Sequence, residues 1–245
     1  MTSEKKSTQL EIACDCILHK IISEKLKPGT PLREDHLAKE FGLSSTPIRE
    51  AFRKLEQDGW LTSVPYRGSF LRTFTAREIE DIYLLREALE TVAVGLAVTR
   101  GEPEDFERID AALRSERDYI AASGDTTSPA PTLEPDMDFH RAICLASHSE
   151  LLAERSRTLY SQLGSIFLSG SIPSSKQELE AVNEEHMMIS GAIRRGWIAE
   201  AEALVRRHIS SARFKHLNFL AEQQTAVTDQ LSSRRRRHRN NGAAQ

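Results

Sequence analysis

Residues 42–60 read GLSSTPIREAFRKLEQDGW, and this stretch decides the fold of the first third of the chain. Gly42 is suited to end a preceding helix, and Ser44 is a good N-cap for the next one, which Gly59 closes. Apolar residues recur in it at i, i+3, i+4 and i+7, which predicts one buried face made of Ile48, Ala51, Phe52 and Leu55. The stretch therefore predicts a short helix that follows a tight turn.

The opposite face of this helix carries small hydroxyl side chains and arginines. Ser45, Arg49 and Arg53 are four residues apart, so they lie on one outward stripe. An arginine can bind guanine or phosphate through two parallel hydrogen bonds, and a helix N-terminus favours phosphate. Such arginines are also typical of a solvated charged face, but the short helix expected at 34–41 favours a helix-turn-helix. We therefore expect DNA contacts from Ser44, Ser45, Thr46, Arg49 and Arg53.

The flanking segments complete a winged helix-turn-helix. Helical spacing of apolar residues from Leu10 predicts a first helix, which ends at the turn 27–30. Two short strands, 60–64 and 69–74, are joined by the turn Pro65-Tyr66-Arg67-Gly68. On its own this pattern is an ordinary hairpin with an exposed arginine, but after a helix-turn-helix it is typical of a wing. Arg67 and Gly68 therefore join the expected DNA contacts.

Charge is distributed unevenly along the 245 residues. Residues 1–74 have 12 Lys+Arg and 10 Asp+Glu, a net charge of +2, whereas residues 75–233 have 16 and 26, a net charge of −10. Residues 234–245 add five arginines and no acid. A weakly basic first third before an acidic body suggests that only the first third meets a polyanion.

Composition excludes several other classes of protein. No apolar run approaches the roughly 18 residues that a membrane-spanning helix needs, so we expect no membrane partner. The N-terminus lacks the apolar core of a secretory signal. Three cysteines cannot form a closed set of disulfides, which favours a reducing, cytoplasmic location.

The remaining chain predicts an all-helical body. Thr75 and Glu78 have the spacing of a capping box, so a helix begins there and runs to about Arg100. Further helices are expected at 103–122, 136–147, 150–170, 174–195 and 198–223, with a loop at 123–135 and no strand after residue 74. The fold class is mostly α: a winged helix-turn-helix with a small β-hairpin wing at 1–74, then an all-α helical-bundle effector domain at 75–223. Residues 224–245 are expected to be a basic, disordered tail, or alternatively a non-specific phosphate contact.

One arginine and a group of four potential metal ligands interrupt the buried faces of this helical body. Arg86 falls on the apolar stripe of the first helix, where a cation needs a partner. It is either ion-paired or placed to receive a carboxylate ligand. Three histidines and one aspartate also fall on inner faces, namely Asp136, His140, His186 and His208. Each histidine alone is typical of a satisfied core residue, but together they are suited to bind divalent zinc, nickel, iron or manganese.

The order of these motifs resembles a known family of regulators. The stretches 28–34, 37–38, 42–51, 55–61 and 67–68 resemble the DNA-binding domain of GntR-family transcription regulators. Two positions depart from the family pattern. Family members commonly have arginine where this chain has Ser45, and some members have arginine where this chain has Asp35. Residues 75–222 resemble the FCD effector domain of the FadR subfamily. The resemblance implies that Asp136, His140, His186 and His208 bind the metal and that Arg86 faces the ligand.

These features together predict a ligand-responsive DNA-binding regulator of a metabolic operon, and not an enzyme. The resemblance implies a homodimer on a palindromic double-stranded DNA operator, with a small organic acid effector that completes the metal coordination and modulates operator binding. The alternative is a metal-dependent hydrolase or lyase that uses the Asp/His cluster. That alternative offers no general base and does not explain the arginine helix. A purely structural metal site is a third possibility.

Overall fold

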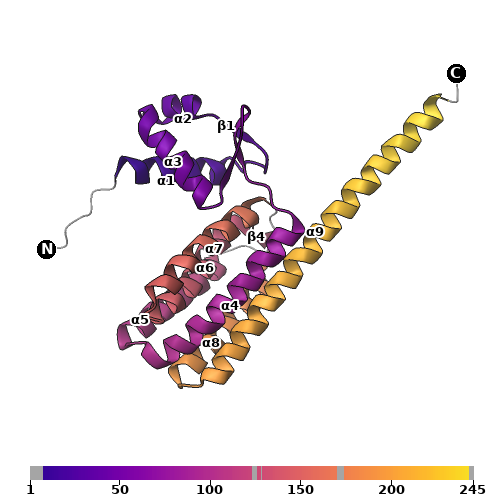
Figure 1. Cartoon of the computed structure of the whole chain (residues 1–245). Helices are drawn as coiled ribbons and strands as arrows, with labels where there is room; N and C mark the ends of the chain where they lie inside the picture. The colour runs from indigo at the N-terminus through magenta and orange to yellow at the C-terminus, as the bar shows by residue number, and fades with distance from the viewer. Residues whose placement is uncertain (1–7, 123–125, 128, 170–173, 243–245) are drawn as a thin grey trace.

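The computed structural model describes residues 8–122, 126–127, 129–169 and 174–242. An N-terminal unit contains α1 (Gln9–Ser23), β1 (Pro31–Leu32), α2 (Glu34–Phe41), α3 (Ser45–Gln57), β2 (Leu61–Val64) and β3 (Gly68–Leu71). A helical bundle follows and contains α4 (Ala76–Arg100), α5 (Pro103–Ala122), β4 (Thr126–Thr127), α6 (Pro129–Ala146), α7 (Glu150–Ser169), β5 (Ser174–Ser175), α8 (Lys176–Arg194) and α9 (Ile198–Gly242). Figure 1 shows the small unit above one end of the bundle.

The N-terminal unit is a winged helix-turn-helix. Gly42 ends α2 in the left-handed conformation, with φ of 65°, and Ser44 is the N-cap of α3. The predicted inner face of α3 is buried and packs against α1, whose own buried residues are Ala13, Ile17 and Ile21. The wing is a three-stranded antiparallel sheet in the order β1-β3-β2. The sequence did not predict β1, because two residues are too few to show an alternating pattern.

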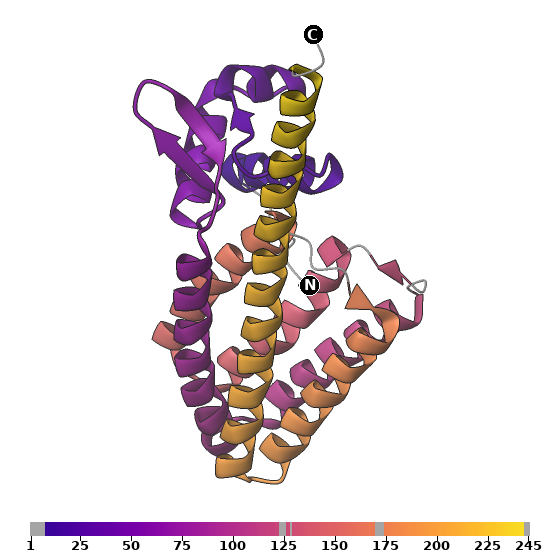
Figure 2. The same cartoon turned by 90° about the vertical axis from the view of Figure 1, so that its right-hand side faces the viewer.

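The bundle begins at the predicted capping box. Thr75 Oγ1 accepts from the backbone of Glu78, and the Glu78 side chain accepts from the backbone of Thr75. The helix α4 then runs to Arg100 and packs along α9, as Figures 1 and 2 both show. The helices α5, α6, α7 and α8 complete the bundle around one apolar core that extends from Ile79 to Ile209. This core is separate from that of the N-terminal unit.

Two predictions about the bundle are wrong. Residues 123–135 are not simply a loop, because α6 already begins at Pro129 and β4 pairs with β5 through Thr126 and Ser175. Prolines 129 and 131 fall in the first helical turn, where no intrahelical N–H bond is needed, so they do not prevent an earlier start. The expectation of no strand after residue 74 fails for the same pair, since two-residue strands leave no sequence signal.

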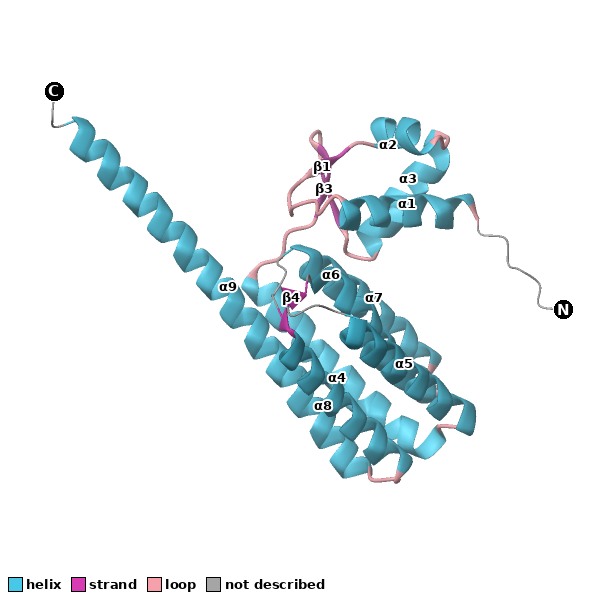
Figure 3. Ribbon diagram, turned by 180° about the vertical axis from the view of Figure 1, so that it is seen from behind, coloured by secondary structure: helices cyan, strands magenta, loops and turns pink. Residues whose placement is uncertain are grey.

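The helix α9 also extends farther than predicted. Its backbone continues through residue 223 to Gly242 in place of the disordered tail expected at 224–242 (Figure 3). The sequence from 224 to 241 contains neither proline nor glycine, and its five arginines tolerate helix. The predicted tail residues 243–245 lie outside the described residues. No helix in the described part of the chain is long and apolar enough to cross a membrane.

The two units touch at few places. The indole Nε1 of Trp60, directly after the end of α3, donates a hydrogen bond of 2.8 Å to Ser161 Oγ on α7. A Cβ built on Gly59 would come within 2.6 Å of Gln162 Cγ, so the end of α3 lies directly against α7. The connection between β3 and α4 is held by an ion pair of 3.2 Å between Arg72 and Glu78.

Candidate DNA-binding face and candidate metal centre

The outward face of α3 has the geometry that the sequence predicted. Ser45, Arg49 and Arg53 are exposed along one side of the helix, and Ser44 and Thr46 are exposed at its start. Ser44 occupies the N-cap position, but its side chain makes no capping hydrogen bond. The first turn of α3 thus presents backbone N–H groups and hydroxyls together with arginines, a combination suited to phosphate and base edges.

A hollow of about 540 Å³ lies between α3, the wing and the β1–α2 corner. Three arginines line it, namely Arg33, Arg49 and Arg67. Two of them are ion-paired: Arg49 Nε lies 3.4 Å from Glu34 Oε2, and Arg33 makes two bonds of 3.2 and 3.1 Å to Asp35. Arg33 was missed by the sequence reasoning, because only the pairing of β1 with β3 brings it beside the wing.

The tip of the wing carries an exposed aromatic residue. Tyr66 is fully exposed and has a φ of 63°, and the adjacent Gly68 has a φ of 94°. Arg67 lies between them, exposed, with its guanidinium 5.9 Å from the centre of the Phe70 ring. Arg67 and Gly68 line the same hollow as Ser45 and Arg49 of α3.

Three helices bring the four predicted metal ligands together. Asp136 and His140 lie on α6, His186 on α8 and His208 on α9, and one ligand atom from each lies within 4.8 Å of the others. The three imidazoles are at most 5% exposed. His186 Nε2 is 3.3 Å from His208 Nε2 and 3.6 Å from Asp136 Oδ1. Buried His140 Nε2 has no hydrogen-bond partner among the described residues.

A carboxylate contacts the Nδ1 atom of each of the three histidines. The Nδ1 atoms of His140, His186 and His208 lie 2.7, 2.9 and 2.7 Å from carboxylate oxygens of Glu90, Glu116 and Glu185, respectively. The His140 contact is poorly aligned for a hydrogen bond, but at 2.7 Å it leaves no space for a water molecule between the two atoms. Acceptors at Nδ1 leave the Nε2 lone pairs available for a metal ion, which is the usual arrangement around one, and His186 Nε2 lies 3.6 Å from Asp136 Oδ1.

Burial keeps these histidines in the form that a metal requires. Desolvation lowers the pKa of His140, although Glu90 opposes the shift, and desolvation lowers the pKa of His186 well below its usual value, with His208 adding to the effect. Both imidazoles are therefore neutral near pH 7 and can donate a lone pair. The donor set of three imidazoles and one carboxylate, with an orphaned buried nitrogen among them, fits a divalent metal.

Arg86 is ion-paired, which is one of the two alternatives considered for it. It is 2% exposed, and its Nε donates a hydrogen bond of 2.6 Å to Glu90 Oε1 on the next turn of α4. Its Nη2, which is also buried, has no partner among the described residues. Burial raises the pKa of a carboxyl such as Glu90, but Arg86 and His140 outweigh this effect and lower it. The ion pair is therefore charged, and one guanidinium nitrogen remains for a ligand.

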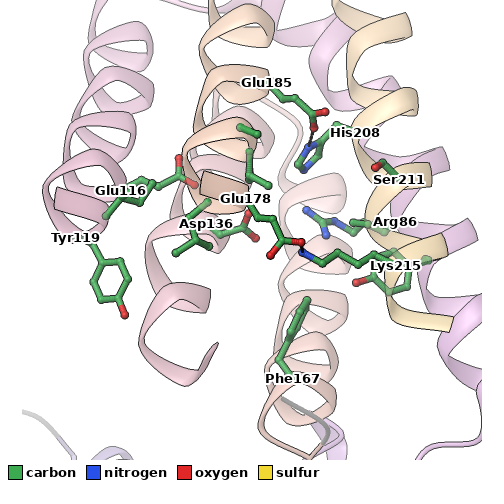
Figure 4. A pocket seen from close by; sticks show the side chains of 16 residues that line it. Arg86, Glu116, Tyr119, Asp136, Phe167, Glu178, Glu185, His208, Ser211 and Lys215 are labelled. Atoms are coloured by element: carbon green, nitrogen blue, oxygen red, sulfur yellow. Dashed lines mark hydrogen bonds and ion pairs between the residues drawn. The ribbon is translucent and has the colours of Figure 1, made fainter. Parts of the chain in front are cut away.

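A pocket of about 320 Å³ opens beside Arg86, Asp136 and His208. Figure 4 shows Arg86, Asp136 and His208 directed toward it, with Phe167 at another side. Ion-paired Lys215 and Glu178, 2.8 Å apart, extend from α9 and α8 near its opening. The wall carries both polar and charged groups, and its apolar part is formed by Ile120, Phe167, Leu179, Val182 and Ala212.

The sequence reasoning missed the three supporting glutamates. The sequence could have revealed Glu90, because it follows Arg86 by four residues and therefore lies on the same buried face of the helix. Glu116 and Glu185 had no comparable signal, because α5 and α8 carry many acidic residues and only the packed bundle selects these two.

Two family models match separate parts of the chain. The sequence model of the bacterial regulatory proteins of the gntR family matches residues 10–71, and that of the FCD domain matches residues 81–211. The Nta operon transcriptional regulator of Aminobacter aminovorans is 29% identical over 204 residues, covering 82% of this chain and 89% of that protein. The HTH-type transcriptional regulator YdhC of Bacillus subtilis is 32% identical over 132 residues, 54% of this chain and 58% of YdhC.

A solved structure shares the fold. Escherichia coli McbR/YncC is similar to this chain with a TM-score of 0.72 and 21% identity, over 89% of this chain and 99% of that one. A DNA-binding unit of this kind joined to a helical domain defines a transcriptional regulator. The chain belongs to the GntR family and carries an FCD domain. The matched proteins are regulators and not enzymes, so a metal-dependent hydrolase or lyase is not supported.

Proposed function

We propose that this protein is a transcription regulator whose helical domain binds a divalent metal and a small carboxylate effector that changes operator affinity. The observation that carries the proposal is the convergence of three histidines with Asp136. Two of these residues, Asp136 and His208, line one pocket together with Arg86, whose Nη2 has no partner among the described residues. Burying these groups is costly unless a ligand satisfies them. We divide the chain accordingly into a DNA-binding domain at 1–74 and an effector and dimerisation domain at 75–223.

Asp136, His140, His186 and His208 hold the metal in this proposal. A bound divalent ion supplies an electrophilic centre that attracts carboxylate oxygens. Arg86 sits beside it and offers a guanidinium N–H to the same group, since one of its nitrogens is already fixed by Glu90. The apolar wall of Phe167, Leu179 and Val182 excludes water from the rest of the effector. An organic acid with an apolar part fits this division of the pocket.

DNA is bound by the stripe on α3 and by the wing in this proposal. Ser44, Ser45, Thr46, Arg49 and Arg53 enter the major groove, and Arg67 and Gly68 contact the adjacent backbone. A homodimer places two such units on a palindromic operator, and GntR regulators are typically dimeric. The outer face of α4 suits the interface, because Leu84, Leu85 and Val92 are each about half exposed on it.

Effector binding alters operator affinity by linkage. A carboxylate that prefers one relative placement of the DNA-binding units shifts the population toward that placement. The helix α7 offers a physical connection between the effector site and the DNA-binding unit, because it contacts both. Tyr160 on α7 lies near Arg86 and His140, and the next residue, Ser161, bonds Trp60 at the end of α3.

Thermal-shift and gel-shift measurements test the proposal. The full chain is first stripped with a chelator, then reloaded with zinc, nickel or manganese and screened against small carboxylates. We expect metal to raise the melting temperature and a subset of acids to raise it further only in the presence of metal. His186→Ala abolishes both shifts, whereas His19→Ala, at an exposed histidine of α1, leaves them intact.

The outcomes separate the alternatives. A metal-dependent rise in melting temperature with no response to any acid points to a structural metal. Acid binding that is unchanged in His186→Ala contradicts the assignment of the site. Salt-sensitive binding to a promoter fragment next to the protein's own gene, lost in Arg49→Ala, tests the DNA-binding half independently of the metal.

A further inference from the structure

The carboxylate of Glu90 touches both halves of the candidate effector site. Its Oε1 accepts from Arg86 Nε at 2.6 Å, and its Oε2 lies 2.7 Å from His140 Nδ1. Glu90 and Arg86 are each 2% exposed, and His140 is fully buried. Glu116 and Glu185 also support histidines, but neither has a recorded contact with Arg86.

This contact fixes the proton on the His140 ring. An ionised carboxylate only accepts hydrogen bonds, and Glu90 forms a buried ion pair of 2.6 Å with the permanently charged guanidinium of Arg86. Two lone pairs at 2.7 Å would repel each other, so Nδ1 must carry the hydrogen. The neutral imidazole then presents its lone pair at Nε2, which faces the other metal ligands.

The same carboxylate fixes the guanidinium of Arg86. Because Nε is held by Glu90, the plane of the guanidinium is set and Nη2 remains unpartnered. If His140 held a metal through Nε2, its Nδ1–H would be a stronger donor to Glu90, and Glu90 would then hold Arg86 less strongly. More of the Arg86 charge would be available for a carboxylate.

We propose that Glu90 is a positioning residue that couples the metal to the effector arginine. It neither binds the metal nor touches the effector; it selects the metal-binding tautomer of His140 and orients Arg86. The inference rests on the proposed metal and carboxylate site and adds to it a reason why the two ligands bind cooperatively.

Glu90→Gln breaks the arrangement with a nearly isosteric change. The amide has one acceptor oxygen and one donor NH2, so it cannot accept from both neighbours. If its oxygen faces Arg86, its NH2 faces His140 Nδ1 and forces the ring hydrogen onto Nε2, which removes a metal ligand. If its oxygen faces His140, its NH2 opposes Arg86 Nε–H and displaces the guanidinium. One of the two functions is lost in either orientation.

Co²⁺ titration of the full chain tests the inference, because the visible spectrum of Co²⁺ reports its coordination. We expect Glu90→Gln to weaken Co²⁺ binding about 10- to 100-fold, the usual effect of losing an outer-shell partner of a ligand, and to alter the spectrum. The matched control is Glu185→Gln, which makes the same change behind His208. Both variants weaken Co²⁺, but at saturating Co²⁺ only Glu90→Gln weakens binding of the probe acid benzoate.

The outcomes distinguish the inference from the function on which it rests. No Co²⁺ binding by the wild-type chain refutes the metal site and this inference with it. Wild-type binding that Glu90→Gln leaves within twofold, with an unchanged spectrum, refutes the role of Glu90 alone. Equal loss of benzoate in both glutamine variants refutes the coupling. If Glu90→Gln does not fold, Glu90→Asp keeps an acceptor-only group. NMR of the imidazole nitrogens must then still find the His140 hydrogen on Nδ1, and a hydrogen on Nε2 refutes the inference.

Discussion

The hydrogen bond between Trp60 and Ser161 predicts a measurable change in how the two units dock. Trp60 Nε1 donates to Ser161 Oγ at 2.8 Å, and Trp60 is 8% exposed. Trp60 also ties α3 to the wing, because its backbone N–H donates to Leu55 O and its carbonyl accepts from Arg72. Removing the Ser161 hydroxyl should therefore loosen the whole DNA-binding unit from α7.

The magnitude follows from the loss of one neutral hydrogen bond. Such a bond contributes about 0.5–1.5 kcal/mol net, and undocking rehydrates the freed indole N–H. At about 1.4 kcal/mol per factor of ten, Ser161→Ala should raise the undocked population roughly 2- to 12-fold. Trp60→Phe removes the other partner and should have a similar effect. Because both variants break the same bond, the double variant should show little further change.

Limited trypsin cleavage after Arg72 measures this population. Arg72 lies in the connection between the units, where it pairs with Glu78 and stacks 4.5 Å from the Phe74 ring centre. When opening is fast relative to cleavage, the cut rate follows the open population. Thr158→Ala, one turn earlier on α7, is the matched control. Ser161→Thr retains a hydroxyl and should keep the hydrogen bond to Trp60. Additive effects of the two partner variants, or a cut rate unchanged in Ser161→Ala, would refute the reasoning.

Three further predictions concern DNA binding and acid stability. Arg49→Ala should weaken binding to a promoter fragment. If Arg49 contacts one phosphate, the variant should reduce the slope of log affinity against log salt by about 0.9. An unchanged slope with weaker sequence selection would instead indicate that Arg49 contacts a base. Ser45→Arg restores the arginine common in the family and should add about 1–3 kcal/mol of discrimination at one base pair, seen as a new preferred base in selection from a random duplex pool. Burial lowers the pKa of His216 from 6.5 to about 4, so its contribution to stability is present above pH 6.5 and is lost as pH falls toward 4. The full shift corresponds to about 3 kcal/mol. Denaturant unfolding of His216→Phe should therefore depend less on pH in this window, and parallel curves for the two proteins would contradict the assignment.

Local chemistry made most of the fold predictable. The sequence predicted α2 to its last residue, because Gly42 can take the left-handed conformation that ends a helix. It predicted the start of α4, since Thr75 and Glu78 satisfy each other's backbone N–H groups. The failures were β1, β4 and β5, whose two-residue pairings depend on a distant partner strand. The continuation of α9 to Gly242 was missed because the arginine-rich sequence after residue 233 suggested a disordered tail, although arginine tolerates helix.

The ligand set of the candidate site was predictable, but its supporting residues were not. Asp136 and His140 share a helix face by spacing, and His186 and His208 follow buried stripes, so their meeting needed only a common core. Which carboxylate stands behind each histidine depends on the rotation of α5 and α8 against α9. No periodicity in one helix encodes that rotation. Only Glu90, four residues after Arg86, had a local signal.

The buried polar cluster around Glu90 argues for a ligand on energetic grounds. A buried ion pair such as Arg86–Glu90 stabilises a fold weakly, because desolvation of both charges offsets their attraction. Unsatisfied Arg86 Nη2 and His140 Nε2 add a further cost within the described core. Apolar residues at these places would pack with no such penalty. In the proposed function, a sequence that keeps arginine, glutamate and three histidines inside one bundle gives up stability in the empty state and would recover it when a metal and an anion bind. Such a dependence of stability on ligand would let binding shift the balance between two arrangements of the DNA-binding units.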